Sequence, residues 1–301
     1  MPLQGDRGVS DMFKNVAIFG LGLLGGSICR ALKKQDPGIF ISAYGRSLSR
    51  IEPALRDGSV DAAGTFDRVS LSGVELAVVC TPVDSSIDII RSILGHGELE
   101  PGAVVIDVGS VKEIIVREVM GLGRSAQFVG CHPMAGSEKT GYEYSRPDLY
   151  SGSSVIITPH SGNSEGDIAT VARFWESLGA RTTVVSPEEH DRIVAYTSHL
   201  PHMIASSLVE VFQEFRRDNE PPSGIGTFIG NGFRDVTRIS SGSPDMWRDI
   251  VLQNRDNIAG AIDRMIGELE RLKKLISGAG PDGGPVHDYF ADAKKIRDGL
   301  K

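Results

Sequence analysis

The first part of the chain alternates short apolar segments with amphipathic ones. The apolar runs have the length and composition of buried strands, and they are Asn15–Phe19, Phe40–Tyr44, Leu76–Cys80, Ala103–Asp107, Gln127–Gly130, Ser154–Thr158 and Thr182–Val185. Helical patterns lie between several of them, as at Ser27–Lys34, Ser86–Leu94 and Val111–Met120. Strand–helix alternation implies right-handed crossovers, so we expect an α/β fold with a largely parallel sheet covered by helices on both faces.

The pattern changes near residue 186. The Ser-Pro-Glu-Glu sequence at 186–189 offers an N-cap, a proline in the first turn and a glutamate at the third position, which is typical of a helix start. A helical pattern then continues to about Arg217, with Pro201 as an interruption. We therefore predict two domains, an α/β domain over 1–186 and an all-α domain over 187–301.

A second long helix is predicted from the Ser-Pro-Asp sequence at 243–245, and a glycine-rich break at 278–284 separates it from a short, charged C-terminal helix. Its apolar stripe is longer than one small helical domain can cover, so we expect a homodimer formed through the C-terminal helices. The alternative is a helix that packs only within its own chain. The stripe consists of Trp247, Ile250, Val251, Ile258, Ile262, Met265, Ile266, Leu269, Leu272 and Leu275.

Composition narrows the class of protein. The chain has 301 residues, a net charge of −7, 40% hydrophobic and 24% charged residues, which is ordinary globular composition. The acidic balance argues against a nucleic-acid partner. We see no signal peptide and no apolar stretch of membrane length, so we expect a cytoplasmic protein without a membrane partner. Cys29, Cys80 and Cys131 are too widely separated for a metal clip, and we expect no metal.

A glycine-rich turn directly follows the first predicted strand. Gly20, Gly22 and Gly25 form a complete G-x-G-x-x-G, with Leu23 and Leu24 between the second and third glycines. The first glycine permits a tight turn, the second lets a pyrophosphate approach the backbone, and the third allows close helix–strand packing. Because the motif lies between a strand and a helix, it predicts a dinucleotide site.

The end of the second strand bears on the choice of dinucleotide. An acidic residue there would bind the ribose 2′-hydroxyl of NAD, but the chain has Arg46 and Ser47. Because Arg46 could face a 2′-phosphate, we favour NADP and keep NAD as possible. The alternative is a solvated arginine, with NAD held by other contacts.

Ligands of an open parallel sheet bind beyond the carboxyl ends of its strands. The turn Thr81-Pro82-Val83 is suited to lie against a cofactor ring. His132 follows the fifth predicted strand, in a loop expected to face the nicotinamide, and is our candidate acid–base group. Ser110 follows the neighbouring strand and could hydrogen-bond both His132 and a substrate hydroxyl. No nucleophile-elbow pattern surrounds Ser110, so nothing indicates a hydrolase.

The helical half carries a second cluster of polar residues. Ser198, His199 and His202 lie around Pro201, and the two histidines share one helical face. No carboxylate is placed to complete a metal site, which leaves anion binding or capping of freed carbonyls. Arg238 is our candidate for a bidentate carboxylate clamp. A structural ion pair with a nearby aspartate such as Asp235 or Asp249 is the alternative.

These blocks together resemble the prephenate dehydrogenases, a family that includes cyclohexadienyl and arogenate dehydrogenases. The glycine turn is generic, but the later blocks occur in the family's order and are specific. They are GLGLLGGS from Gly20, DVGSVK from Asp107, HPMAGSEKTG from His132, SHLPH from Ser198, GFRDVTRI from Gly232 and DMWRDI from Asp245. The resemblance implies a Rossmann domain followed by a helical dimerisation domain.

The resemblance also implies an activity, the oxidative decarboxylation of prephenate to 4-hydroxyphenylpyruvate with hydride transfer to NAD(P). His132 would take the proton of the ring hydroxyl and Ser110 would hold that hydroxyl. Arg238 would bind the ring carboxylate and His202 the pyruvyl end. Other residues that would line the substrate site are Ser198, Glu138 and Trp247, with Asp235 in support.

Three other functions stay open. Arogenate dehydrogenase would give tyrosine directly, from a substrate with an amino group in place of the keto group. A β-hydroxyacid dehydrogenase would need a catalytic lysine in the helical half, where we find none that matches. A dinucleotide sensor without turnover would lack the base and the carboxylate clamp. We also expect a monofunctional enzyme, without a chorismate mutase segment or a regulatory ACT domain, so that any inhibition by tyrosine would act at the active site.

Overall fold

An eight-stranded sheet forms the first half of the protein in a computed structural model, which describes residues 12–123, 127–136, 139–218 and 224–300. The strand order is β3-β2-β1-β4-β5-β6-β7-β8, and all neighbouring strands are parallel except β6 and β7. The strands are β1 (Asn15–Phe19), β2 (Phe40–Gly45), β3 (Ala62–Thr65), β4 (Leu76–Val79), β5 (Val104–Asp107), β6 (Phe128–Pro133), β7 (Ser154–Thr158) and β8 (Arg181–Val184).

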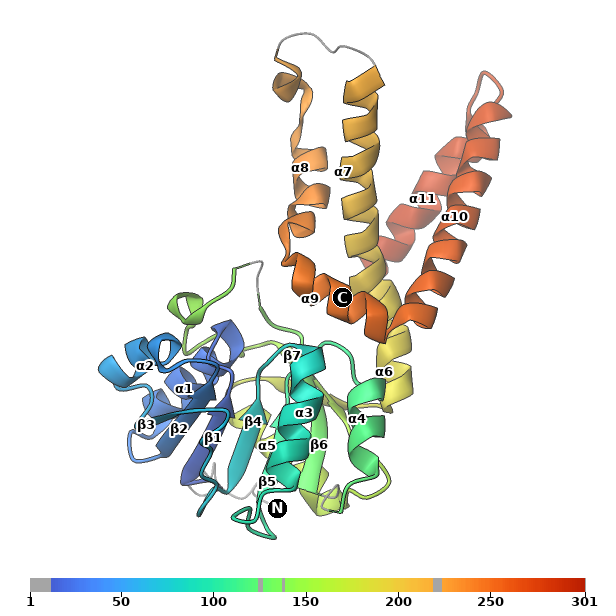
Figure 1. Cartoon of the computed structure of the whole chain (residues 1–301). Coiled ribbons are helices and arrows are strands. Elements are labelled where there is room, and N and C mark those ends of the chain that lie inside the picture. Colours follow the sequence, from blue (N-terminus) through green and yellow to red (C-terminus); the bar gives the residue numbers. More distant parts are fainter. Residues whose placement is uncertain (1–11, 124–126, 137–138, 219–223, 301) are drawn as a thin grey trace, which may run out of the picture.

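Helices cover both faces of this sheet, as predicted (Figure 1). One core lies beneath α1 (Leu23–Gln35) and α5 (Glu165–Ser177), and the other beneath α3 (Val83–Leu94) and α4 (Glu113–Met120). Shorter elements connect the layers, namely η2 (Leu48–Arg50), α2 (Glu52–Arg56) and η4 (Tyr142–Tyr144). The doubly covered, mostly parallel sheet is the expected Rossmann-type architecture.

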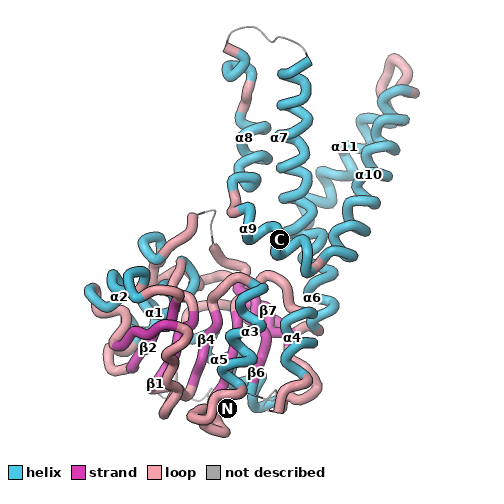
Figure 2. The backbone as a smooth tube through the Cα atoms, in the orientation of Figure 1, coloured by secondary structure: helices cyan, strands magenta, loops and turns pink. Residues whose placement is uncertain are grey.

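Helices are the only regular elements among the described residues of the second half, and Figure 2 shows the change from strands to helices plainly. The long helices project away from the sheet, with α8 beside α7 and α11 beside α10 (Figure 1). The elements are α6 (Pro187–Val194), η5 (Ala195–His199), α7 (Leu200–Asp218), η6 (Ile225–Phe228), α8 (Asn231–Thr237), η7 (Arg238–Ser241), α9 (Pro244–Gln253), α10 (Arg255–Ser277) and α11 (Gly284–Gly299).

The two predicted serine caps are present. Ser186 Oγ accepts a hydrogen bond from the Glu189 amide at 3.1 Å, and Ser243 Oγ accepts one from the Met246 amide at 3.5 Å. Each satisfies an amide that the first helical turn would otherwise leave unpaired. Local sequence therefore fixed where both helices begin.

Several elements differ from the sequence-based expectations. Strand β3 was not predicted, because its Ala-Ala-Gly-Thr sequence has no apolar alternation and it lies at the sheet edge. The second long helix is two helices, α9 and α10, separated at Asn254, and the C-terminal helix α11 has 16 residues rather than being short. Strand β6 continues through His132, so this histidine lies within a strand and not in the loop after it.

A third apolar cluster joins the two halves. Val111, which precedes α4, packs with Ala195, Ile250 and Ile258 from the helical half. Gln253 Nε2 also donates to Asp84 Oδ1 at 2.8 Å, which connects α9 to α3. The helical half is therefore packed against one end of the sheet domain.

Candidate active site

The glycine turn has the geometry that the dinucleotide hypothesis requires. Gly20 has φ +95°, and a Cβ there would lie 2.8 Å from Thr81 Cγ2, so a side chain is excluded both by conformation and by contact. A Cβ on Gly25 would lie 2.3 Å from the Gly20 carbonyl oxygen. At Gly22, in contrast, a Cβ would meet no atom within 4 Å. The open space at Gly22 leaves the start of α1 accessible to a phosphate group.

Other predicted cofactor residues lie close to this turn. Thr81 lies against the Gly20 position, and its Oγ1 is 3.0 Å from Ser86 Oγ. Pro82 is the N-cap residue of α3. Arg46 is exposed after β2, and Ser47 Oγ lies 3.1 Å from Ser49 Oγ. Leu23 and Leu24 open α1, and Val83 opens α3. The residues present therefore fit a bound dinucleotide across the β1 and β4 ends.

His132 is buried and held by a second histidine. Its Nδ1 lies 2.8 Å from Nε2 of His190 on α6, and His190 Nδ1 lies 2.7 Å from Asp191 Oδ1. Within the described chain, His132 Nε2 has no hydrogen-bond partner. Burial lowers the pKa of His132 well below its ordinary value, and the nearby His190 is the second-largest cause. His132 is therefore neutral at neutral pH, as a general base must be.

Ser110 does not hydrogen-bond to His132 in this structure. It is half-buried in the loop after β5, while His132 Nδ1 is bonded to His190 instead. His190 was missed at the sequence level, because nothing in the sequence of α6 indicates that its side chain reaches a strand 58 residues earlier. The histidine beside an aspartate in α6 could have marked His190 as a candidate, but not His132 as its partner.

A buried ion pair fixes the backbone just before His132. Lys112 Nζ is paired with Asp107 and also donates to the Cys131 carbonyl at 2.9 Å. Asp107 Oδ1 accepts from the Cys131 amide at 3.0 Å. Lys112 and Asp107 are completely buried. The two side chains therefore bind both backbone groups of Cys131 on the β5 side, where the pairing of β5 with β6 ends at Val129.

The helical half brings its polar cluster toward this end of the sheet. The His202 ring stacks on Trp247 with 3.5 Å between ring centroids, and His199 meets the same indole edge-on. Asn254 Nδ2 donates to the Asp191 carbonyl at 2.8 Å and lies 3.2 Å from His199 Nδ1. These contacts join the predicted substrate residues of α7 and α9 to the His190–Asp191 pair of α6.

The histidines of this cluster resist protonation. Burial lowers the pKa of His199 to about 4 and also lowers the pKa of His202. His199 Nε2 is buried without a partner among the described residues. Within the same residues, no group of three or more His, Cys, Asp or Glu side chains could hold a metal ion.

The turn around Pro201 has a structural consequence. Proline lacks an amide N–H and crowds the preceding turn, and here the helix widens into the π-helical turn η5 instead of breaking. This turn carries Ser198, which is half-buried, and His199.

Arg238 lies where α8 passes into η7, and η7 packs against α7. Its side chain is exposed but is not without an interaction partner. Asp249, one of the proposed structural partners, is instead bound by Arg248 at 2.7 Å. Glu138 lies outside the described residues.

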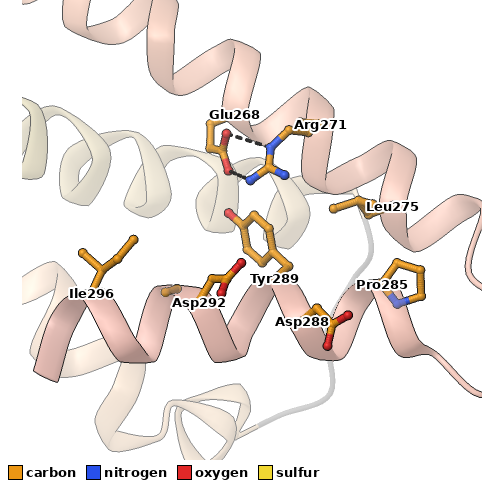
Figure 3. Close-up of a pocket in the computed structure, with 9 residues that line it drawn as sticks. Glu268, Arg271, Leu275, Pro285, Asp288, Tyr289, Asp292 and Ile296 are labelled. Atoms are coloured by element: carbon orange, nitrogen blue, oxygen red, sulfur yellow. Dashed lines mark hydrogen bonds and ion pairs between the residues drawn. The ribbon is translucent and has the colours of Figure 1, made fainter.

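Figure 3 shows a hollow elsewhere, between α10 and α11. Arg271 and Glu268 line it and pair with each other at 2.7 Å. None of the residues predicted for catalysis or cofactor binding contributes to it. We therefore do not assign the chemistry to this hollow.

A Rossmann-type sheet with a glycine turn, joined by helices over a buried neutral histidine, defines a dinucleotide-dependent dehydrogenase of two parts.

Comparison with known proteins names the family. Residues 28–184 match the prephenate dehydrogenase nucleotide-binding domain, and residues 186–291 match the prephenate dehydrogenase dimerization domain. The chain belongs to the prephenate dehydrogenase family. None of its described helices combines the length and apolar character needed to cross a bilayer.

Individual relatives agree along nearly the whole chain. The prephenate dehydrogenase of Bacillus subtilis is 35% identical over 97% of this chain and 77% of its own length. The cyclohexadienyl dehydrogenase of Zymomonas mobilis is 31% identical over 96% of this chain and 97% of its own. The Aquifex aeolicus prephenate dehydrogenase, solved with hydroxyphenyl propionate and NAD+, is 32% identical with a TM-score of 0.86, over 96% of this chain and 98% of that one.

Proposed function

We propose that this protein catalyses the oxidative decarboxylation of prephenate to 4-hydroxyphenylpyruvate, a step of tyrosine biosynthesis, with NAD(P) as the hydride acceptor. The observation that carries the proposal is the state of His132, a buried imidazole bonded through Nδ1 while Nε2 has no partner in the described chain. Family membership supports it, as does the Aquifex aeolicus relative solved with a hydroxyphenyl acid and NAD+.

The proposed roles rest on the chemistry of each residue and on the resemblance of the sequence blocks to the family. His132 Nε2 takes the proton of the ring hydroxyl, and Ser110 orients that hydroxyl. Arg238 binds the ring carboxylate, and His202, stacked on Trp247, holds the pyruvyl end. Loss of carbon dioxide makes the ring aromatic, so the residues mainly have to orient the substrate and accept one proton. Ser198 and Glu138 are proposed to line the same site.

The bound dinucleotide supplies the hydride acceptor. We propose that the turn formed by Gly20, Gly22 and Gly25 holds its pyrophosphate. We favour NADP because Arg46 and Ser47 follow β2 where an acidic residue would favour NAD. The Arg46→Asp variant should shift the ratio of kcat/KM values toward NAD. Equal use of NAD and NADP by the wild type would remove the reason for favouring NADP.

We further propose that the two functional units divide at residue 186, between β8 and α6, and that the protein is a homodimer through its C-terminal helices. Exposed apolar side chains on α10, among them Ile266 and Leu269, support the second proposal. The match to a dimerization domain supports it as well.

The decisive experiment is an assay of the purified protein with prephenate and with arogenate, each with NAD and with NADP. We expect oxidation of prephenate, and His132→Asn should lower kcat about 100- to 10,000-fold, as loss of a general base does. Binding of NADP, followed by fluorescence titration, should be unchanged in this variant. Activity with arogenate alone would assign the alternative substrate, and an active His132→Asn variant would remove His132 as the base.

A further inference from the structure

Three buried acid–base groups form a chain of hydrogen bonds, called a line below, that begins at His132. His132 Nδ1 lies 2.8 Å from His190 Nε2, and His190 Nδ1 lies 2.7 Å from Asp191 Oδ1. The three residues are 8%, 2% and 1% exposed. The first comes from β6 and the other two from α6, so the line crosses from the sheet to the helical half.

The hydrogen bonds of Asp191 determine where the protons of this line lie. Its carboxylate oxygens accept from the backbone amides of Lys112 at 2.8 Å and Glu113 at 3.0 Å. A carboxylate used in this way is an acceptor, so His190 Nδ1 carries a hydrogen and donates it to Asp191. In a neutral His190 ring, Nε2 then has a lone pair and accepts. His132 Nδ1 must therefore donate, which leaves the lone pair of His132 on Nε2.

We infer that His190 and Asp191 are positioning residues, which hold His132 in the tautomer with a basic Nε2 and receive the positive charge that His132 gains during turnover. The inference rests on the proposed function and adds two residues to it. It also gives the helical half a part in proton transfer besides substrate binding.

The proton balance is simple. The substrate hydroxyl proton moves to His132 Nε2 while the ring carbon gives up its hydride, for which a bound dinucleotide would be the acceptor. The carboxylate departs as carbon dioxide and leaves its bonding electron pair to the ring. In the same step the Nδ1 proton of His132 moves to His190 Nε2, which leaves His132 neutral and His190 an imidazolium against the Asp191 carboxylate. The electron pair left by the carboxylate makes the ring aromatic and leaves its oxygen as a phenolate. The two transfers then reverse, and His132 Nε2 returns the proton to this oxygen, which gives the phenol of 4-hydroxyphenylpyruvate before the product leaves.

The surrounding charges favour this direction of transfer. Lys112 and His199 face His132 together with His190, and all of them disfavour a positive charge on its ring. Asp107 pairs with the Lys112 ammonium. His199 faces Asp191 and His190 from η5, and His202 faces His199 from α7. Because Asp191 contacts His190 directly, the charge is better balanced on His190 than on His132.

The His190→Gln variant tests the inference. Glutamine can still accept a hydrogen bond from His132 Nδ1 but cannot take its proton. We expect kcat for prephenate to fall about 100-fold, with KM and the dissociation constant of NADP changed less than about threefold. The acid limb of the kcat profile should move to lower pH, because the proton must then stay on the desolvated ring of His132.

A matched control is present on the surface. His287 bonds to the adjacent Asp288 at 3.2 Å on the exposed helix α11, as His190 does to Asp191. His287→Gln should therefore keep the wild-type kcat and pH profile. Unchanged kcat and an unchanged acid limb in His190→Gln would overturn the inference.

A second measurement needs no variant. In mixtures of H2O and D2O, two protons in transit give the wild-type rate a curved dependence on deuterium fraction, and a linear dependence would contradict the relay. The proposed function fails separately, if the wild type binds NADP but oxidises neither prephenate nor arogenate. If the wild type turns over prephenate and its rate depends linearly on deuterium fraction, only the relay is contradicted.

Discussion

Burial controls the chemistry of the individual histidines. His132 and His199 are both removed from water, and burial is the largest cause of the lowered pKa of each. A ring buried in its neutral form can act as a base or as a hydrogen-bond partner but opposes the binding of a proton. Two predictions about single residues follow from this chemistry and from the proposed carboxylate clamp.

The first prediction concerns stability at acid pH. The pKa of His199 is about 4 in the folded protein against an ordinary value of 6.5, so between these values the unfolded chain binds more protons than the folded one. Above about pH 6.5, His199 does not lower the free energy of unfolding. As the pH falls toward 4, protonation of His199 in the unfolded chain lowers that free energy by about 3 kcal/mol. His132 acts in the same direction. Thermal unfolding at a series of pH values should show this loss.

The His199→Gln variant should show a shallower dependence of Tm on pH, since one group that resists protonation has been removed. His287→Gln, at an exposed position, should retain the wild-type dependence. An equal slope in His199→Gln and the wild type would mean that His199 is not responsible.

The second prediction concerns Arg238. If its guanidinium binds the ring carboxylate, Arg238→Gln should raise KM for prephenate about 10- to 100-fold, the value of one or two charged hydrogen bonds. Arg234→Gln is the matched control, because Arg234 lies one turn earlier on α8 and donates to the Ile229 carbonyl. Steady-state kinetics of both variants would test the clamp, and a loss confined to kcat in Arg238→Gln would contradict it.

At the scale of elements, the end of β6 depends on side chains as well as on strand pairing. On one side β7 pairs with Gly130 through Pro133. On the other, Asp107 and Lys112 bind the backbone of Cys131 in place of a strand. Removing one member of a buried ion pair leaves the other charge unbalanced. The position of His132 should therefore depend on this pair.

Lys112→Met should lower the free energy of unfolding by about 3 to 5 kcal/mol, measured by chemical denaturation. Adding Asp107→Asn should cost less than the sum of the single changes, because the two groups interact directly. Lys294→Met, which breaks the exposed pair with Asp298 on α11, should have little effect. Additive costs in the double variant would show that the pair does not act as a unit.

The elements also show where sequence reasoning was limited. Short apolar runs gave β1 and β7 with their observed bounds, and they placed the other inner strands within a few residues. They missed β3, because an edge strand with one short, small-residue sequence has no distinctive period. They also placed His132 in a loop, because the pairing that extends β6 comes from β7, which is distant in sequence.

At the scale of the whole molecule, the long helices leave apolar surface uncovered. Ile266, Leu269 and Ile276 on α10 are 50%, 52% and 58% exposed, and α7 and α10 project away from the sheet domain (Figure 1). Apolar positions repeated along one projecting helix are expected to be covered by another chain. The match to a dimerization domain agrees with that expectation.

Leu269→Glu should therefore weaken the dimer, since a carboxylate would have to be buried at the interface. Sedimentation velocity should show a shift from dimer to monomer at micromolar concentration. Leu48→Glu is the matched control, because Leu48 is 54% exposed but lies on the sheet domain. A Leu269→Glu protein that stays dimeric would place the interface elsewhere.

The alternation of strands and helices, the two serine-capped helix starts and the glycine turn could all be read from the sequence, because each depends on residues close together in the chain. It also supplied the motifs that identify the family. The hydrogen bonds that run from His132 through His190 to Asp191, and those of Asp107 and Lys112 to Cys131, could be found only in the folded protein. Those hydrogen bonds join residues whose separation in space is set by packing, about which local periodicity carries no information.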